Sequence, residues 1–186
     1  TQLLEARKGL LKLTQDQTNI LKDVFVDAHT QVTNALTKYA DSKDIIKISR
    51  LQAVKRELER IFDDAITTTG NYMLDDISAS VKLATDANLK AGMAYVAETD
   101  PKLLADFGNT IGKGFSTINK DAVTAVIARL YDDDKSFSDR IWALRNTSKT
   151  MISRVVGAGV AQGLSARNLA RQLEPMLKGF KELQGP

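Results

Sequence analysis

The sequence predicts an all-α protein, an elongated bundle of long helices with a smaller C-terminal helical module. Apolar residues make up 43% of the 186 residues, which is enough for a buried core, whereas aromatic residues make up only 6%. Three prolines and eleven glycines leave room for long uninterrupted helices. Alternation of apolar and polar residues, the mark of a half-buried strand, never extends beyond a few positions.

The first predicted helix covers residues 3–39. Its second half carries an apolar stripe with alternating spacings of four and three, which is the seam of a helix packed along another helix. The partner helix belongs either to the same chain or to another subunit. The stripe comprises Leu21, Phe25, Ala28, Val32, Ala35 and Tyr39, and we predict Leu21, Phe25, Val32 and Tyr39 as partner-docking residues.

Two more helices are expected in the first part of the chain, over residues 45–68 and 72–98. The β-branched run and glycine at Thr67–Asn71 are expected to end the first of them. Residues 1–98 are therefore predicted to be a long-helix bundle or extension. A short helix with Asp100 as N-cap and Pro101 at its first position is expected to end at Gly108. It leads into a glycine-rich loop, so that residues 99–118 form a second segment.

Residues 119–186 are predicted to be the C-terminal helical module. Asn119 is expected to cap a helix that runs to about Tyr131, and Ser138 to cap the next. A further segment starts near Thr147. Gly163 is expected to end it in a turn, and Ser165 to cap the final helix, which Pro175 kinks or stops.

Three segments are candidates for a chemical site, but their residues do not match the pattern that each kind of site requires. The segment Gly108–Gly114 has the wrong glycine spacing for a phosphate loop, and Gly114 stands where Ser or Thr is required. The aspartates at 132–134 are better explained as a solvated acidic turn than as a cation site. His29, the only histidine, has no companion ligand and is interpreted as structural. We therefore expect no enzyme activity, cofactor or metal.

The composition bounds the class of protein further. Without cysteine, disulfides, Cys-ligated zinc and thiol catalysis are excluded. The longest apolar run, residues 155–161, is far shorter than the roughly 20 residues that span a bilayer, so we expect no membrane partner.

Charge is unevenly distributed along the chain. From Arg140 onward, eight basic and two acidic residues give +6, while the whole chain carries +3. This predicts either a solvated helical surface or contact with DNA or an acidic protein. The segment 164–173 resembles half of a helix-turn-helix unit, although no recognition helix follows it. Candidate phosphate contacts are Arg167, Arg171, Lys178 and Lys181.

The densest local signals lie between Ser136 and Leu177. The segment holds the only tryptophan, Trp142, between Arg140 and Arg145. We expect Trp142 to be a core anchor, because a lone tryptophan among Ile and Leu usually buries, and the alternative is a partner-facing edge of the module. Glycines at 157 and 159 lower helix propensity, which is more tolerable where a neighbour packs closely. The residues that carry the pattern of this segment are Phe137, Ser138, Arg140, Ile141, Trp142, Gly163, Ser165, Leu169 and Arg171.

These positions, FSDRIW followed by a helix, Gly-x-Ser and LARQL, resemble the core of the minor head proteins of tailed bacteriophages. These are the head-morphogenesis proteins related to the F protein of phage Mu, and the resemblance covers about 40 residues. It implies a structural virion protein that associates with the portal vertex, in several copies, through the portal protein or the major capsid protein. It also implies a role in head assembly, with packaged DNA as a further partner in genome packaging or delivery. The expected location is the phage head, and the host cytoplasm during assembly. The alternative from the residues alone is a non-specific DNA-binding helical protein that uses the basic C-terminal part.

Overall fold

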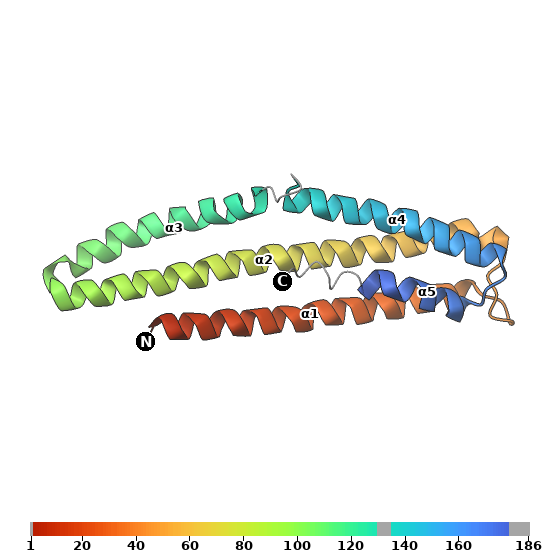
Figure 1. Ribbon diagram of the computed structural model, residues 1–186, viewed down its shortest axis with the longest axis horizontal. Coiled ribbons are helices and arrows are strands. Elements are labelled where there is room, and N and C mark those ends of the chain that lie inside the picture. Colours follow the sequence, from red (N-terminus) through yellow and green to blue (C-terminus); the bar gives the residue numbers. More distant parts are fainter. Residues whose placement is uncertain (1, 130–134, 179–186) are drawn as a thin grey trace. The chain divides into compact units, whose positions relative to one another are not determined.

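A computed structural model describes residues 2–129 and 135–178, apart from a few side chains within the helices. Every regular element in these residues is helical, which confirms the predicted all-α class with long helices (Figure 1). Two isolated bridges, Ala40 to Ile46 and Ile45 to Ser165, are the extended pairings in the described part. The elements are α1 (Gln2–Tyr39), η1 (Ile48–Arg50), α2 (Leu51–Thr99), η2 (Pro101–Leu103), α3 (Leu104–Ala128), α4 (Phe137–Ala161) and α5 (Ala166–Lys178).

Helix α2 is continuous for 49 residues, so the predicted break at Thr67–Asn71 is wrong. The hydroxyl of Thr67 donates to the carbonyl of Asp63 at 2.7 Å, one helical turn back, which accommodates the threonine inside the helix. Gly70 packs against the side chain of Ile141 on α4. The glycine therefore serves helix packing and does not terminate α2. The predicted start at Ile45 is also early, because Ile45 and Ile46 belong to the connection before η1.

Helix α3 runs without interruption through Gly108–Gly114 and Asn119, so the predicted glycine-rich loop and second helix start are wrong. Glycines lie where α3 meets α2: Gly92 faces the ring of Phe107, and Gly108 faces the end of Met93. Their missing side chains allow the two helices to approach, and this packing outweighs the low helix propensity of glycine. The predicted cap before it is confirmed, because the Asp100 carboxylate accepts from Lys102 N–H at 3.2 Å.

Helix α4 is a single helix, although two segments are predicted there. It begins at Phe137, so Ser138 lies in its first turn and is not its cap. The polar stretch near Thr147 stays helical, and Ser148 within it is buried. Helix α5 continues through Pro175 to Lys178, so of the predicted kink or stop at Pro175 the stop is wrong and the kink stays a prediction. Leu173 and Leu177 are both buried, and they hold the helix on either side of the proline.

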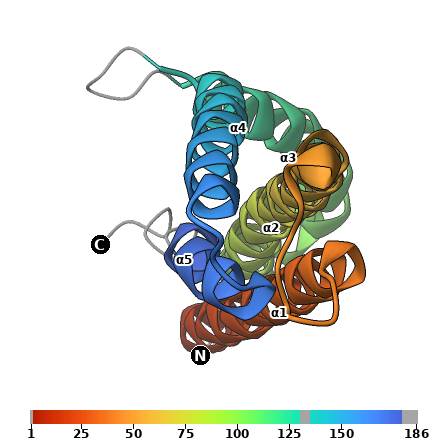
Figure 2. The same ribbon diagram turned by 90° about the vertical axis from the view of Figure 1, so that its right-hand side faces the viewer.

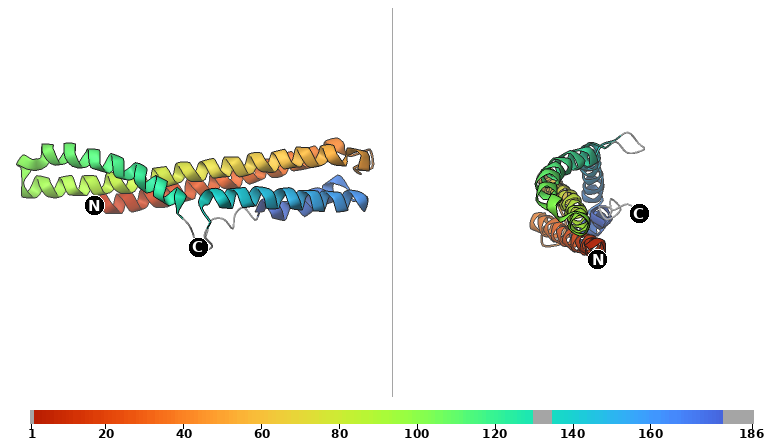
Figure 3. Two further views of the ribbon diagram at one scale, coloured as in Figure 1. Left: turned by 90° about the horizontal axis from the view of Figure 1, so that it is seen from above. Right: turned by 90° about the vertical axis from the view of Figure 1, so that its left-hand side faces the viewer.

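The helices group into two compact units. Unit 1 comprises Thr1–Thr18 and Asn71–Ser138, and unit 2 comprises Asn19–Gly70 and Asp139–Pro186. In unit 1, α3 folds back along the second half of α2 (Figure 3). Its described residues include few buried side chains, Ala87 and Phe137. The predicted division at residues 98 and 118 stays a prediction.

Unit 2 holds the hydrophobic core, built from α1, α2, α4 and α5. The predicted α1 stripe faces this interior, and Val32 is fully buried. The predicted docking residues Leu21, Phe25 and Val32 are therefore core residues, and Tyr39 packs against them. The seam thus packs on its own chain, the first of the two alternatives. The largest fully buried side chains are Phe62, Leu36, Ile46, Leu58, Ile66, Ile152, Leu169, Leu173, Leu177, Val32, Val54 and Val156.

One end of unit 2 is closed by the contact of two connections (Figure 2). Asp44, between α1 and α2, accepts from Ala166 N–H with its carbonyl at 2.7 Å and from Arg167 N–H with its carboxylate at 3.4 Å. Ser165 caps α5 as predicted, because its hydroxyl accepts from Asn168 N–H at 3.2 Å. Asp44 has a φ of 60°, and aspartate tolerates this left-handed conformation better than most residues. The turn at Gly163 is confirmed, with a φ of 69°.

The connection is also shaped by Asp41, and this makes it sensitive to acid. Its carboxylate accepts from Lys43 N–H at 2.9 Å and from Ile45 N–H at 3.2 Å, and these bonds hold the pKa of Asp41 below its ordinary value of 3.8. A lowered folded-state pKa gives stability that is present above the unfolded pKa and lost as pH falls through the folded one.

We predict that Asp41→Asn, which keeps an acceptor oxygen but does not titrate, is less stable than the wild type near neutral pH. The difference should shrink as pH falls from about 5 to about 3, because only the wild type has a titrating carboxylate at position 41, and the unfolded chain takes up its proton before the folded one does. Urea unfolding followed by circular dichroism at a series of pH values measures it. A difference that stays constant over this range would contradict the role given to Asp41.

A second prediction concerns two glycines of α4. A Cβ at Gly159 would overlap the side chain of Leu169, whereas one at Gly157 would meet only the end of Lys55, at 3.5 Å. We expect Gly159→Ala to destabilise the protein by about 1–3 kcal/mol through overpacking. Gly157→Ala is the matched control and should be neutral or stabilising by up to about 1 kcal/mol, from helix propensity. Equal effects in urea unfolding would show that α5 does not pack closely on Gly159.

Candidate interaction surface on helix α4

The sequence motif that begins at Phe137 lies on α4, the turn after it and α5. Ile141 packs on Gly70 of α2, and further along α4 the side chains of Ile152 and Val156 are fully buried. On α5, Leu169 is fully buried, while Arg171 is exposed. The motif thus lies on one helical hairpin, α4 and α5, which contributes Leu169 to the unit 2 core and packs Ile141 against it.

Trp142 is the exception, and the prediction that it anchors the core is wrong. Its side chain is 69% exposed. Ile141 already occupies the inward position, and the next residue lies about 100° further around the helix, which turns Trp142 to solvent. Its neighbours one turn and two turns on, Asn146 and Lys149, are also exposed. A tryptophan this exposed on a helix is a candidate contact for another molecule.

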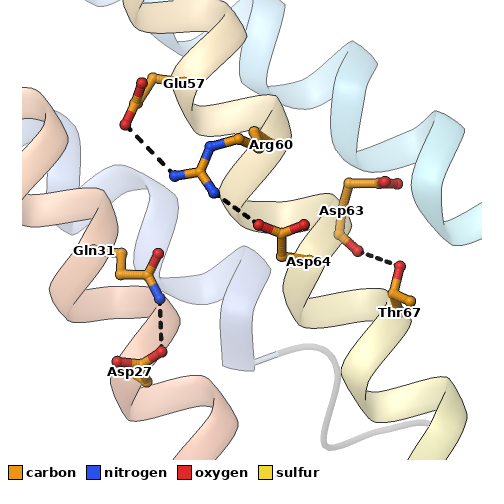
Figure 4. A network of polar contacts seen from close by, with 7 residues as sticks. All are labelled: Asp27, Gln31, Glu57, Arg60, Asp63, Asp64 and Thr67. Carbon is orange, nitrogen blue, oxygen red and sulfur yellow. Dashed lines mark hydrogen bonds and ion pairs between the residues drawn. The ribbon is translucent and has the colours of Figure 1, made fainter.

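The two arginines that flank Trp142 are partly buried against the protein. Arg145 donates from Nη2 to the hydroxyl of Thr67, and its Nε lies 3.0 Å from Oδ1 of Asp63. The Nε contact is an ion pair without hydrogen-bond geometry. Figure 4 shows Asp63 and Thr67 joined on α2. Arg145 therefore ties α4 to α2, so it supports the position of Trp142 and is not an open cation.

The predicted phosphate contacts are only partly placed. Arg167 and Arg171 are exposed on α5, one turn apart. The side chain of Lys178 and the whole of Lys181 lie outside the described residues, as do the aspartates at 132–134. The described structure thus brings two of the four predicted cations together on one short helix.

His29 lies in a shallow depression between α1 and α5. The depression combines apolar side chains with single polar groups of both signs. Its lining residues are Lys22, Phe25, Val26, His29, Thr30, Glu174 and Leu177. In the described part of the chain, no group of three or more His, Cys, Asp or Glu side chains is placed to hold a metal ion. No described helix combines the length and apolar character needed to cross a lipid bilayer.

Comparison of the chain with protein-family models, with curated proteins and with solved structures finds no match.

Two features of the surface are not predictable from the local sequence. The exposure of Trp142 depends on which face of α4 meets α2, and the sequence of α4 alone does not specify that. Asp44 as a cap for α5, 122 positions before Ala166, likewise leaves no local signal.

The exposure of Trp142 can be tested directly, because it is the only tryptophan in the chain. Its fluorescence should show the red-shifted emission of a hydrated indole and strong quenching by acrylamide. Trp142→Ala should change the free energy of unfolding by no more than about 0.5 kcal/mol, as for other surface substitutions. Ile152→Ala, at a buried position of the same helix, should cost about 2–5 kcal/mol. A blue-shifted emission that acrylamide does not quench would show that Trp142 is buried and would contradict its exposure.

Proposed function

We propose that this chain is a structural component of a tailed-bacteriophage head, a minor head protein that associates with the portal vertex. In this role it acts in head assembly and in genome packaging or delivery, without catalysis of its own. Its partners are the portal protein, the major capsid protein or both, with several copies at the vertex. It resides in the phage head, and in the host cytoplasm during assembly.

The observation that carries the proposal is that some residues of the phage-like motif pack within the protein while its tryptophan is exposed. Its apolar members Ile141 and Leu169 build the helical hairpin, whereas its tryptophan is exposed on that hairpin. Tryptophan is enriched among the few residues that dominate binding at protein interfaces. An exposed tryptophan within the resembling segment therefore supports a partner-binding role for the motif, and α4 replaces the α1 seam as the surface we assign to it.

The alternative function, non-specific DNA binding, retains Arg167 and Arg171. Of the four candidate contacts, the described residues place these two on one helix, whereas strong salt-dependent binding involves about 6–10 phosphate contacts. A surface centred on tryptophan also favours a protein partner over a phosphate backbone. We therefore keep DNA as a secondary partner of the proposed head protein.

Association with the portal protein tests the proposal. The chain should co-purify with the portal protein of the phage that encodes it, and Trp142→Ala should weaken this association at least about tenfold, the effect of losing about 1.4 kcal/mol. Tyr95→Ala is the matched control, because Tyr95 is an equally exposed aromatic residue of α2, at 67%. It should leave association unchanged.

Two results would count against the proposal. Absence of co-purification of the wild-type chain would remove the portal as partner, and equal binding by both variants would remove Trp142 as the contact. Point variants are preferable to deletion of residues 1–40, because the deletion removes core residues such as Val32 and Leu36 and would unfold unit 2.

A further inference from the structure

The connection between α1 and α2, with the first residues of α5, forms a surface that we call the tip. It comprises residues 41–50 together with Arg167. The two acidic side chains of the tip are engaged with backbone N–H groups. Asp41 accepts from Lys43 and Ile45 within the connection, and Asp44 accepts from Arg167 at the start of α5. Their carboxylates therefore point toward the backbone of the tip.

The basic side chains of the tip are exposed. Lys43, Lys47 and Arg167 are solvent-exposed, and Arg50 donates from Nη1 to the carbonyl of Tyr39 at 3.0 Å while remaining exposed. Ile48, between Lys47 and Arg50 in the sequence, is 72% exposed, more than any other large apolar side chain in the described chain. The tip thus combines an exposed apolar residue with four exposed cations, at the end of unit 2 that Figure 2 shows nearest the viewer.

A surface of opposite charge lies on the side of unit 2, and we call it the acidic face. On α1 it carries Asp23 and Asp27, both exposed, and Gln31 donates to Oδ2 of Asp27 at 2.6 Å. Neither aspartate forms an ion pair with another described residue. Ile20, on the same side of α1, is partly exposed at 36%.

Helix α2 contributes the rest of the acidic face. Arg60 lies between two carboxylates, 2.8 Å from Asp64 and 3.6 Å from Glu57, so its positive charge is already countered by two negative ones. Arg56, one turn before Arg60, is also exposed. The charged groups named on α1 and α2 are thus four carboxylates, those of Asp23, Asp27, Glu57 and Asp64, against two arginines, and Figure 4 shows most of them. The acidic face therefore keeps an excess of negative charge, with Ile20 on its α1 side, and its charge is opposite to that of the tip.

We propose that the tip of one copy of this chain docks on the acidic face of a second copy. The carboxylates of Asp23 and Asp27 face Lys43 and Lys47 of the neighbouring copy in this contact, and Ile48 leaves water. The two surfaces are different parts of the molecule, so the contact is heterologous. Heterologous contacts produce closed rings or open filaments, and not isolated two-fold dimers.

Ile48 distinguishes a protein occupant from a nucleic acid. A phosphate backbone would engage the cations but gives a protruding isoleucine no apolar partner, whereas a protein surface offers both. The chain itself carries an acidic surface with an apolar edge, so a second copy meets both requirements. The inference does not depend on the proposed phage function.

The contact should be weak and sensitive to salt. Charges exposed at a rim are screened over about 10 Å at 0.1 M salt and about 3 Å at 1 M. Sedimentation velocity of the full chain at low salt should show an average mass that rises with protein concentration. Addition of about 0.5 M NaCl should abolish the rise, because the attraction is then screened at contact distance.

Charge reversal separates the two surfaces. Lys43→Glu/Lys47→Glu reverses the tip, and Asp23→Lys/Asp27→Lys reverses the acidic face, and each variant alone should self-associate at least about tenfold more weakly than the wild type. An equimolar mixture of the two variants should associate again, since the unaltered tip of one meets the unaltered face of the other. The chain that carries all four substitutions should also recover self-association.

Matched controls come from exposed charges elsewhere on α2. Lys82→Glu/Lys90→Glu and Asp75→Lys/Asp86→Lys make the same changes in net charge and should leave self-association unaltered. Circular dichroism should show that every variant is folded.

Lack of self-association of the wild type at low salt, or failure of the mixture to associate, would overturn the inference. Equal weakening by the controls would assign the effect to net charge and overturn it as well. Salt-sensitive binding of a mixed-sequence DNA duplex, lost only in the tip variant, would make the tip a nucleic-acid site instead.

Discussion

Burial of the α1 seam beneath α2, α4 and α5 is the interaction on which unit 2 depends. Side chains spaced alternately four and three apart, from Leu21 to Val32, enter one core with Leu58 and Phe62 of α2. Each fully buried aliphatic or aromatic side chain contributes about 1.5–3 kcal/mol. Because this core fixes the rotation of each helix, it also decides which residues of α4 and of the connections remain at the surface.

The same helix behaves differently toward its N-terminus. Leu4 and Leu11 continue the heptad positions of α1, yet Leu11 is 63% exposed. Thr14 and Thr18 interrupt the apolar stripe between them and Leu21, and both hydroxyls bond back to the carbonyl four residues earlier. Helix α1 is therefore continuous, but only the part from Leu21 onward lies in the buried core. Stability against local unfolding is expected to vary along α1.

The features predicted correctly from sequence are those determined by neighbouring residues. The α1 seam, the Asp100 and Ser165 caps and the turn at Gly163 each follow from side-chain type and local spacing. The errors arose where tertiary packing overrides local preference. The local sequence at Gly70 predicts a helix end, but Ile141 packs against this glycine inside α2. The apolar neighbours of Trp142 predict burial, whereas its exposure depends on which face of α4 meets α2, and the local sequence does not encode that.

The surfaces we assign to partners follow from the same packing, because α4 can present Trp142, and the tip its cations, only while unit 2 is closed. Amide hydrogen exchange along α1 tests this directly. Residues 21–36 should exchange slowly, close to the rate set by global unfolding, while residues 4–18 should exchange markedly faster. Uniform protection along α1, or slower exchange in residues 4–18, would contradict a core confined to unit 2.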